Sequence, residues 1–397
     1  MLLTLTASLL VVAAGATVTP WTTVFPLQVV GQGQEREVLV TDLVVEPDSG
    51  TTVFVERSRQ IGTEVGQWTY RHVMMDIRTR KVLSERPLDD PDNLPGYTAV
   101  SSSRSTVVVL NRNPRAERRV MGLDVAVWKP ASGPGSYAIY EDWLEEKLPG
   151  GRGSKFEPRG FGPPAVSDDG AKVAYFAVRH WSTAEPDSGG SQTVVVLLDL
   201  ETGQFTWAPT PFAAPEEAFT MDWTMQFGPD GESLLVKLHR DFNDVRIETD
   251  PATGVGGYLK NPVLHLFRWE PPSREMTKIG LLPEGTMALS TGGDAVVMER
   301  DETVVPQESR YWRSRAVLLV PAADIGRVGG ASQRSQAALL GLARPIQVLA
   351  PDSPRADWQI LKVFAGRKAI FAVISHFLGG RDEKLLVELN ASVPAPK

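Results

Sequence analysis

Residues 165–178 read AVSDDGAKVAYFAV, and this stretch indicates the fold more clearly than any other part of the chain. It joins a short apolar pair to an apolar run through the turn sequence Ser167-Asp168-Asp169-Gly170. Asp-Gly between two apolar runs is a strong hairpin signal, because both residues tolerate the positive φ angles of tight turns. The stretch therefore predicts two short antiparallel strands joined by a tight turn.

The same turn, followed by an apolar strand, recurs along the chain. The clear copies are Pro47-Asp48-Ser49-Gly50 and Gly228-Pro229-Asp230-Gly231, and weaker copies lie at 103–105, 292–294 and 366–367. The markers Gly50, Ser105, Gly170, Gly231, Gly293 and Gly366 are separated by 55, 65, 61, 62 and 73 residues, a mean of about 63. The chain is therefore a series of similar units rather than a set of unrelated domains.

About six such units, with four short strands in each and no long helical periodicity, are typical of a β-propeller. We expect an all-β fold, a six-bladed β-propeller with seven blades as the alternative, in which residues 17–397 form one domain. The last unit supplies only three strands, so we expect the extended segment Trp21–Val30 to complete the last blade and close the ring. The segment Tyr140–Leu148 has apolar residues on one side and Glu on the other, which predicts a short helix packed on the disc.

The turns also resemble those of a known family. Ser167-Asp168-Asp169-Gly170 and Gly228-Pro229-Asp230-Gly231 look like the SPDG turn of TolB-like, WD40-like propeller repeats, and Asp199–Gly203 resembles the DLxTG turn of the same blades. The resemblance extends over residues 36–390 and is strongest in the third and fourth units. Units two, five and six lack the full turn, and no room precedes Gly50 for the α/β domain of TolB. The resemblance therefore implies the fold and no role in the Tol system.

Composition excludes several classes of function. The 397 residues carry a formal charge of −7 and include no cysteine, which rules out disulfides, thiolate metal sites and cysteine nucleophiles. No basic run supplies the footprint of a nucleic-acid-binding protein, so we expect no nucleic-acid partner. The sequence contains no GxSxG, P-loop, HExxH or EF-hand motif, and we expect no metal and no cofactor.

The N-terminal segment predicts the compartment. Met1–Ala16 is an apolar run that ends in Ala14-Gly15-Ala16, which is typical of a signal peptide cut after Ala16, although no basic residue precedes the run. A retained hydrophobic anchor and a buried first strand are the alternatives for residues 1–16. We expect a periplasmic or secreted protein whose mature chain has no membrane span, because no other segment is apolar over the ~20 residues that a span needs.

Polar residues follow the second strand of each unit, at the end opposite to the hairpin turns. The basic and histidine side chains among them are Arg57, Arg112, Arg179, His180, His239, Arg240, Arg300 and His376. Such a ring around one mouth is a candidate site for a polar or anionic ligand. The alternative is that these residues are polar only because strand ends are solvated. The long loops Arg179–Gln192 and His239–Asn261 lie on the same predicted face.

Three functions are compatible with these features. We expect a scaffold, not an enzyme, that binds a protein partner or a polar or anionic small ligand on the loop-rich face. The alternative is an enzyme, a lyase or hydrolase of an extracellular polymer, with His180, His239 and Arg300 near the mouth. A third possibility is a structural subunit of an envelope assembly, which predicts a large exposed apolar patch away from the mouth.

Overall fold

In the part of the chain that it describes, the computed structural model consists of β-strands joined by turns and two short 3₁₀ helices, η2 (Pro130–Ser132) and η4 (Ala322–Asp324). The structure describes residues 21–30, 36–60, 68–88, 95–112, 123–132, 137–140, 144–148, 152–181, 189–211, 223–239, 247–249, 256–259, 264–283, 286–290, 292–300, 314–325, 344–348, 358–378 and 381–389. No helix in these ranges is long and apolar enough to cross a membrane.

The first three sheets follow one another along the chain, and neighbouring strands in each are antiparallel. The first sheet contains β2 (Gln28–Val30), β3 (Arg36–Glu46), β4 (Thr51–Gln60), β5 (Thr69–Asp76) and β6 (Val82–Leu88). The second contains β7 (Pro95–Val100), β8 (Val107–Arg112), β9 (Leu123–Trp128) and β10 (Tyr137–Tyr140). The third contains β11 (Leu144–Leu148), β12 (Arg152–Pro158), β13 (Ala165–Val166), β14 (Lys172–Trp181), β15 (Gly190–Asp199) and β16 (Phe205–Pro209).

The next three sheets continue the series. The fourth contains β17 (Thr224–Phe227), β18 (Leu234–His239), β21 (Leu264–Trp269) and β22 (Met276–Leu282), and β19 (Ile247–Thr249) pairs with β20 (Gly256–Leu259) in a separate hairpin. The fifth contains β23 (Thr286–Leu289), β24 (Ala295–Arg300), β25 (Ser314–Val320) and β26 (Arg344–Val348). The sixth contains β27 (Trp358–Ala365), β28 (Ile370–Leu378), β29 (Arg381–Leu389) and β1 (Trp21–Pro26).

The hairpin turns have the geometry that the sequence predicts. Gly50, Gly170, Gly231 and Gly293 all have positive φ, between 66° and 88°. At Gly170 a side chain is excluded by space as well, since a Cβ atom would lie 2.3 Å from the hydroxyl of Ser105 in the second sheet. The turn of one sheet therefore packs directly on the turn of the next.

Clusters of buried apolar side chains join the sheets. In the described part of the chain there are six such clusters, and each is shared by two sheets. Five of them join sheets that are consecutive along the chain, as where the rings of Phe176 and Trp223 lie 5.4 Å apart between the third and fourth sheets. The remaining cluster joins the first sheet to the sixth and includes Phe54 and Phe371. Consecutive antiparallel sheets that bury their faces against each other are the architecture of a β-propeller.

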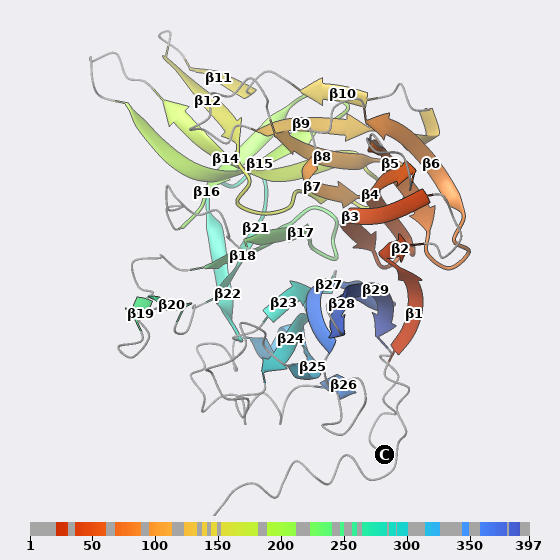
Figure 1. Cartoon of the computed structure of the whole chain (residues 1–397). Coiled ribbons are helices and arrows are strands. Elements are labelled where there is room, and N and C mark those ends of the chain that lie inside the picture. Colours follow the sequence, from red (N-terminus) through yellow and green to blue (C-terminus); the bar gives the residue numbers. More distant parts are fainter. Residues whose placement is uncertain are drawn as a thin grey trace, which may run out of the picture.

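The two ends of the described chain share one sheet, as Figure 1 shows for β1 and β29. Trp21 pairs with Leu389 and Thr23 with Val387. The expected strand Trp21–Val30 is divided at Leu27, because Gln28–Val30 pairs with β3 in the first sheet instead. Leu27 itself donates its main-chain N–H to the carbonyl of Lys384 and accepts the N–H of Val40, both at 2.8 Å.

The helix expected over Tyr140–Leu148 is wrong. Tyr140 ends β10 of the second sheet, and Leu144–Leu148 forms β11, the outer strand of the third sheet. Leu144 lies opposite Phe156 of β12 and packs against the cluster between the second and third sheets. Pairing with β12 satisfies the backbone hydrogen bonds and buries Leu144, so tertiary context overrides the local helical pattern.

Candidate functional site

The turns that precede β4, β8, β14, β18 and β28 gather at one end of the molecule. We call this end, formed by the turns at 47–50, 101–106, 167–171, 228–233 and 366–369, the turn end. There the hydroxyl of Ser102 donates to Oδ1 of Asp168 at 3.0 Å, and the main-chain N–H of Ser103 donates to the Asp168 carbonyl at 2.8 Å. These bonds join the turn of the second sheet to the turn of the third.

Asp48 joins the first sheet to the sixth. Its Oδ1 accepts the main-chain N–H groups of Arg367 at 2.7 Å and Lys368 at 3.0 Å. Buried Glu46, close by, accepts the N–H of Ser49 at 2.6 Å and the hydroxyl of Ser102 at 3.1 Å. A chain of charge-assisted hydrogen bonds therefore runs from the sixth sheet through the first to the second.

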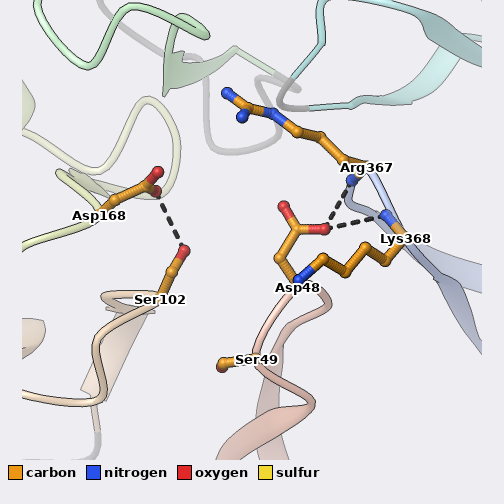
Figure 2. Close-up of a pocket in the computed structure, with 6 residues that line it drawn as sticks. All are labelled: Asp48, Ser49, Ser102, Asp168, Arg367 and Lys368. Carbon is orange, nitrogen blue, oxygen red and sulfur yellow. Dashed lines mark hydrogen bonds between the residues drawn. The ribbon is translucent and has the colours of Figure 1, made fainter.

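These turns surround a cavity of about 400 Å³ (Figure 2). It is lined by Asp48, Ser49, Ser102, Asp168, Arg367 and Lys368. The Arg367 side chain extends toward the fourth sheet, where its Nη2 donates to the carbonyl of Pro229 at 3.2 Å. The residues that line the cavity thus belong to the first, second, third and sixth sheets, and Arg367 connects the cavity to the fourth sheet. The volume of the cavity lies in the range of small-molecule pockets.

The charged groups of the cavity have different partners. Arg367 and Lys368 are exposed, and neither side chain forms an ion pair with an acidic group in the part of the chain that the structure describes. The Asp168 carboxylate is also exposed and accepts one hydrogen bond through Oδ1. The cavity is therefore lined by two cations, by the Asp168 carboxylate, and by the Asp48 carboxylate, whose Oδ1 already accepts two main-chain N–H groups.

Other aspartates at the turn end hold the turns themselves. Oδ1 of Asp169 accepts the hydroxyl of Ser167 at 2.6 Å and the N–H of Ala171 at 2.9 Å, and these bonds lower the pKa of the carboxyl. Asp230 is partly desolvated, which opposes ionisation, but hydrogen bonds from Ser233 and nearby groups lower its pKa to about 2. The two carboxylates are therefore ionised at neutral pH and stabilise their turns.

Asp42 and Lys362 form a second charged group. They lie on β3 and β27, the strands that run into the turns of Asp48 and Arg367. Asp42 lies at a β-bulge with φ of 52°. Lys362 Nζ lies 3.4 Å from the carbonyl of Leu43 and 4.9 Å from the centre of the Phe364 ring. Both side chains are solvent-accessible, yet close packing of protein around them raises the pKa of Asp42 and lowers that of Lys362 by desolvation.

The residues predicted at the opposite end are distributed over several sheets. Arg57 of β4 lies 4.9 Å from the ring centre of Trp68 and 5.2 Å from that of Tyr70. Arg179 of β14 lies 4.4 Å from the ring centre of Trp207 and donates to the hydroxyl of Ser154 at 3.0 Å. These contacts are within the first sheet and the third sheet, respectively.

His180, the neighbour of Arg179, lies beside a buried carboxylate. Its Nε2 is 3.2 Å from Oε2 of Glu157, which also pairs with Arg159 at 2.8 Å. Arg112, His239 and Arg300 end their strands, and His376 lies near the end of β28, but their side chains are outside the described part, as is all of Arg240. Arg179 and His180 are consecutive in β14, so their side chains project from opposite faces of the strand. The structure describes no contact between either of them and Arg57. Most of the two long loops also lies outside the described residues.

None of the six residues that line the cavity is among the site residues predicted from the sequence. Asp48 and Asp168 belong to the turns that mark the repeat, and the sequence predicts no functional role for those turns. Within the turn 167–170, Asp169 faces inward to the turn and Asp168 faces the cavity, a distinction that needs the neighbouring sheets. Among the described residues, no group of His, Asp and Glu side chains is arranged to hold a metal ion.

No protein-family model and no curated protein matches this chain. Among solved structures, it is similar to the acylaminoacyl peptidase of Pyrococcus horikoshii at 11% identity and a TM-score of 0.43, over 90% of this chain and 46% of that one. The chain thus spans about half the length of that peptidase. It is also similar to the β-propeller domain of the Trilobed protease from Pyrococcus furiosus (9% identity, TM-score 0.44, 89% and 82% of the two chains). A third similar structure is the polysaccharide lyase Uly1 (9% identity, TM-score 0.41, 89% and 90% of the two chains).

Proposed function

We propose that this protein is a six-bladed β-propeller of the TolB-like kind, closed by β1 in the last blade, which serves as a binding scaffold. Each of the six sheets is then one blade. The cluster that contains Phe54 and Phe371 and the hydrogen bonds of Leu27 support the closure, since they tie the first sheet to the sixth. A closed ring leaves no unpaired inner faces, so it needs no disulfide to be stable.

The turn-end cavity is the binding site of this scaffold. The observation that carries the proposal is the arrangement of Arg367 and Lys368, two cationic side chains without an acidic partner among the described residues, over a cavity of about 400 Å³. Their main-chain N–H groups are held by Asp48, so the backbone that carries them is fixed before a ligand arrives. Fixed cationic groups bind a polar ligand with little loss of conformational freedom.

The opposite end of the ring is a surface for a protein partner. Arg57 stacks on Trp68, and Arg179 on Trp181 at 5.1 Å, and all four side chains are half-buried. Tryptophan and arginine are the residue types that dominate protein interfaces. Replacing Arg57 and Arg179 by Gln should abolish capture of such a partner and leave small-ligand binding at the turn end unchanged.

Residues 1–16 direct export in this proposal, so the working protein is periplasmic or secreted. Expression of the full chain with a C-terminal tag tests this. We expect the mature protein to begin after Ala16 in the periplasm or the medium. A protein that keeps Met1 and stays in the cytoplasm would contradict it.

A thermal-shift screen with small polar compounds tests the cavity as the binding site. Compounds that stabilise the wild-type protein are measured again by calorimetry with the double variant Arg367→Gln/Lys368→Gln. Lys278→Gln, which removes an exposed charge on β22, is the matched control. We expect the double variant to lose binding and the control to retain it. Ligands that bind both variants equally would contradict the proposed site, and turnover of a compound would favour the enzyme reading.

A further inference from the structure

The charged groups of the turn-end cavity lie on opposite sides of it. Figure 2 shows Asp168 and Ser102 on one side, and Arg367 and Lys368 on the other. The two sides come from different sheets: Asp168 belongs to the turn before β14, and Arg367 to the turn before β28. A ligand that spans the cavity therefore meets the Asp168 carboxylate at one end. At the other end it meets two cations and the Asp48 carboxylate, a side with a net positive charge.

The cationic side is suited to a carboxylate. A guanidinium presents its N–H donors as a planar fork that matches the two oxygens of a carboxylate. Contact with the Pro229 carbonyl uses Nη2 of Arg367, which leaves the remaining donors of the guanidinium for a ligand. Lys368 adds a second positive charge, and in Figure 2 the Asp48 carboxylate lies between the Arg367 and Lys368 side chains.

The anionic side is suited to an ammonium. Oδ1 of Asp168 accepts the Ser102 hydroxyl at 3.0 Å, and the Ser103 N–H holds the Asp168 carbonyl at 2.8 Å, so the carboxylate has a fixed position. A carboxylate in this position accepts a hydrogen bond from a cationic N–H group, which is about twice as strong as one from a neutral group.

Other ligand classes fit less well. None of the six described lining residues is aromatic, so the described part of the lining gives no stacking surface for a sugar ring or a nucleobase. A ligand with a phosphate at each end would place one of them against Asp168, where the two negative charges repel. We propose that the cavity binds a small zwitterion with separated charges, its carboxylate on Arg367 and Lys368 and its ammonium on Asp168. This inference rests on the proposed function of the cavity as a ligand site.

Isothermal titration calorimetry at low salt with three probes tests the inference. The probes are L-alanyl-L-alanine, its N-acetyl derivative without the ammonium, and its C-terminal amide without the carboxylate. With the wild-type protein we expect the free dipeptide to bind, and each blocked form to bind about tenfold more weakly, as for the loss of one charge-assisted hydrogen bond.

Two variants assign the ends of the ligand. In Asp168→Asn, N-acetylation should cost no affinity, while the amide still binds more weakly than the free acid. In Arg367→Gln, amidation should cost less affinity than in the wild-type protein, because only Lys368 remains to bind the carboxylate, while N-acetylation should keep its full effect. Asparagine still accepts the Ser102 hydroxyl, so the turn is retained, and circular dichroism of each variant with Lys278→Gln as control verifies folding.

Several results would overturn the inference. If acetylation weakens binding equally in the wild-type protein and in Asp168→Asn, the ammonium does not bind Asp168. If the dipeptide binds no better than its blocked forms, or not at all, the ligand class is wrong. The proposed function fails separately, when compounds of any class bind the Arg367→Gln/Lys368→Gln variant as well as the wild-type protein.

Discussion

Asp48 accepts a hydrogen bond from the main-chain N–H of Arg367 at 2.7 Å, although the two residues are 319 positions apart in the chain. The same carboxylate oxygen accepts the N–H of Lys368 at 3.0 Å. One side chain of the first sheet therefore fixes the turn of the sixth sheet that carries both cations of the cavity. The same two hydrogen bonds therefore hold the first sheet against the sixth and position the two cations of the cavity.

Replacing Asp48 by Ala should destabilise the protein by about 1–3 kcal/mol, because two main-chain donors lose a charged acceptor. Urea denaturation measures this. Asp48→Asn keeps one acceptor oxygen and should lose less, and Glu201→Ala, at an exposed turn position, is the control. Equal stability of Asp48→Ala and the wild-type protein would show that Asp48 does not hold the last turn.

His72 should make the protein sensitive to mild acid. It is buried between the first two sheets, with its ring 6.4 Å from that of Trp128, and neither ring nitrogen has a hydrogen-bond partner among the residues that the structure describes. Burial and, to a smaller extent, the charge of Arg86 lower its pKa from 6.5 to about 4. The unfolded state therefore takes up a proton near pH 6.5 while the folded state does not, and stability falls as the pH decreases from 6.5 toward 4.

At pH 5 this loss amounts to about 2 kcal/mol relative to pH 7.5. Urea midpoints of the wild-type protein and of His72→Gln between pH 5 and 7.5 measure it. The variant should show a smaller pH dependence, whereas Thr277→Ala, which changes an exposed residue without an ionisable group, should keep the wild-type slope. The same slope in all three proteins would contradict the assignment to His72.

Lys362 should react with an amine reagent at lower pH than other lysines do. Desolvation lowers its pKa, and the charge of Asp42 partly opposes this effect. Labelling with acetic anhydride between pH 7 and 10, read by mass spectrometry, compares Lys362 with exposed Lys278. Asp42→Asn should shift the Lys362 profile to still lower pH. Identical profiles for the two lysines would show that Lys362 is fully solvated.

Sequence reasoning predicts the local units well, because they depend on neighbouring residues. The turn at Gly170 and the strands on either side follow from Asp-Gly chemistry and from the alternation of apolar residues. The sequence predictions fail for segments whose structure is decided by pairing with other strands, which the local pattern does not show. Leu144 forms a strand because β12 is available to pair with it, and Leu27 divides the first segment because two sheets meet there.

The cavity could not be predicted for the same reason. Asp48 and Asp168 occupy turns that look alike in sequence, and Arg367 follows the weakest copy of that turn. Only the packing of the sheets places these side chains around a common space. The predicted residues at the opposite strand ends remain a prediction, since five of the eight have side chains outside the described part of the chain.

A disulfide cross-link between β1 and β29 is the most direct test of the claim that the first and last sheets meet to build the ring and its cavity. Because the chain has no cysteine, the pair Thr22→Cys/Glu388→Cys can be introduced alone, at positions that face each other in the register. Thr22→Cys/Lys384→Cys is the control, four residues or about 13 Å out of register. Under mild oxidation we expect a disulfide in the first pair and none in the second, read by non-reducing electrophoresis and peptide mass. Failure of the first pair to cross-link, or equal cross-linking of both, would contradict the closed ring.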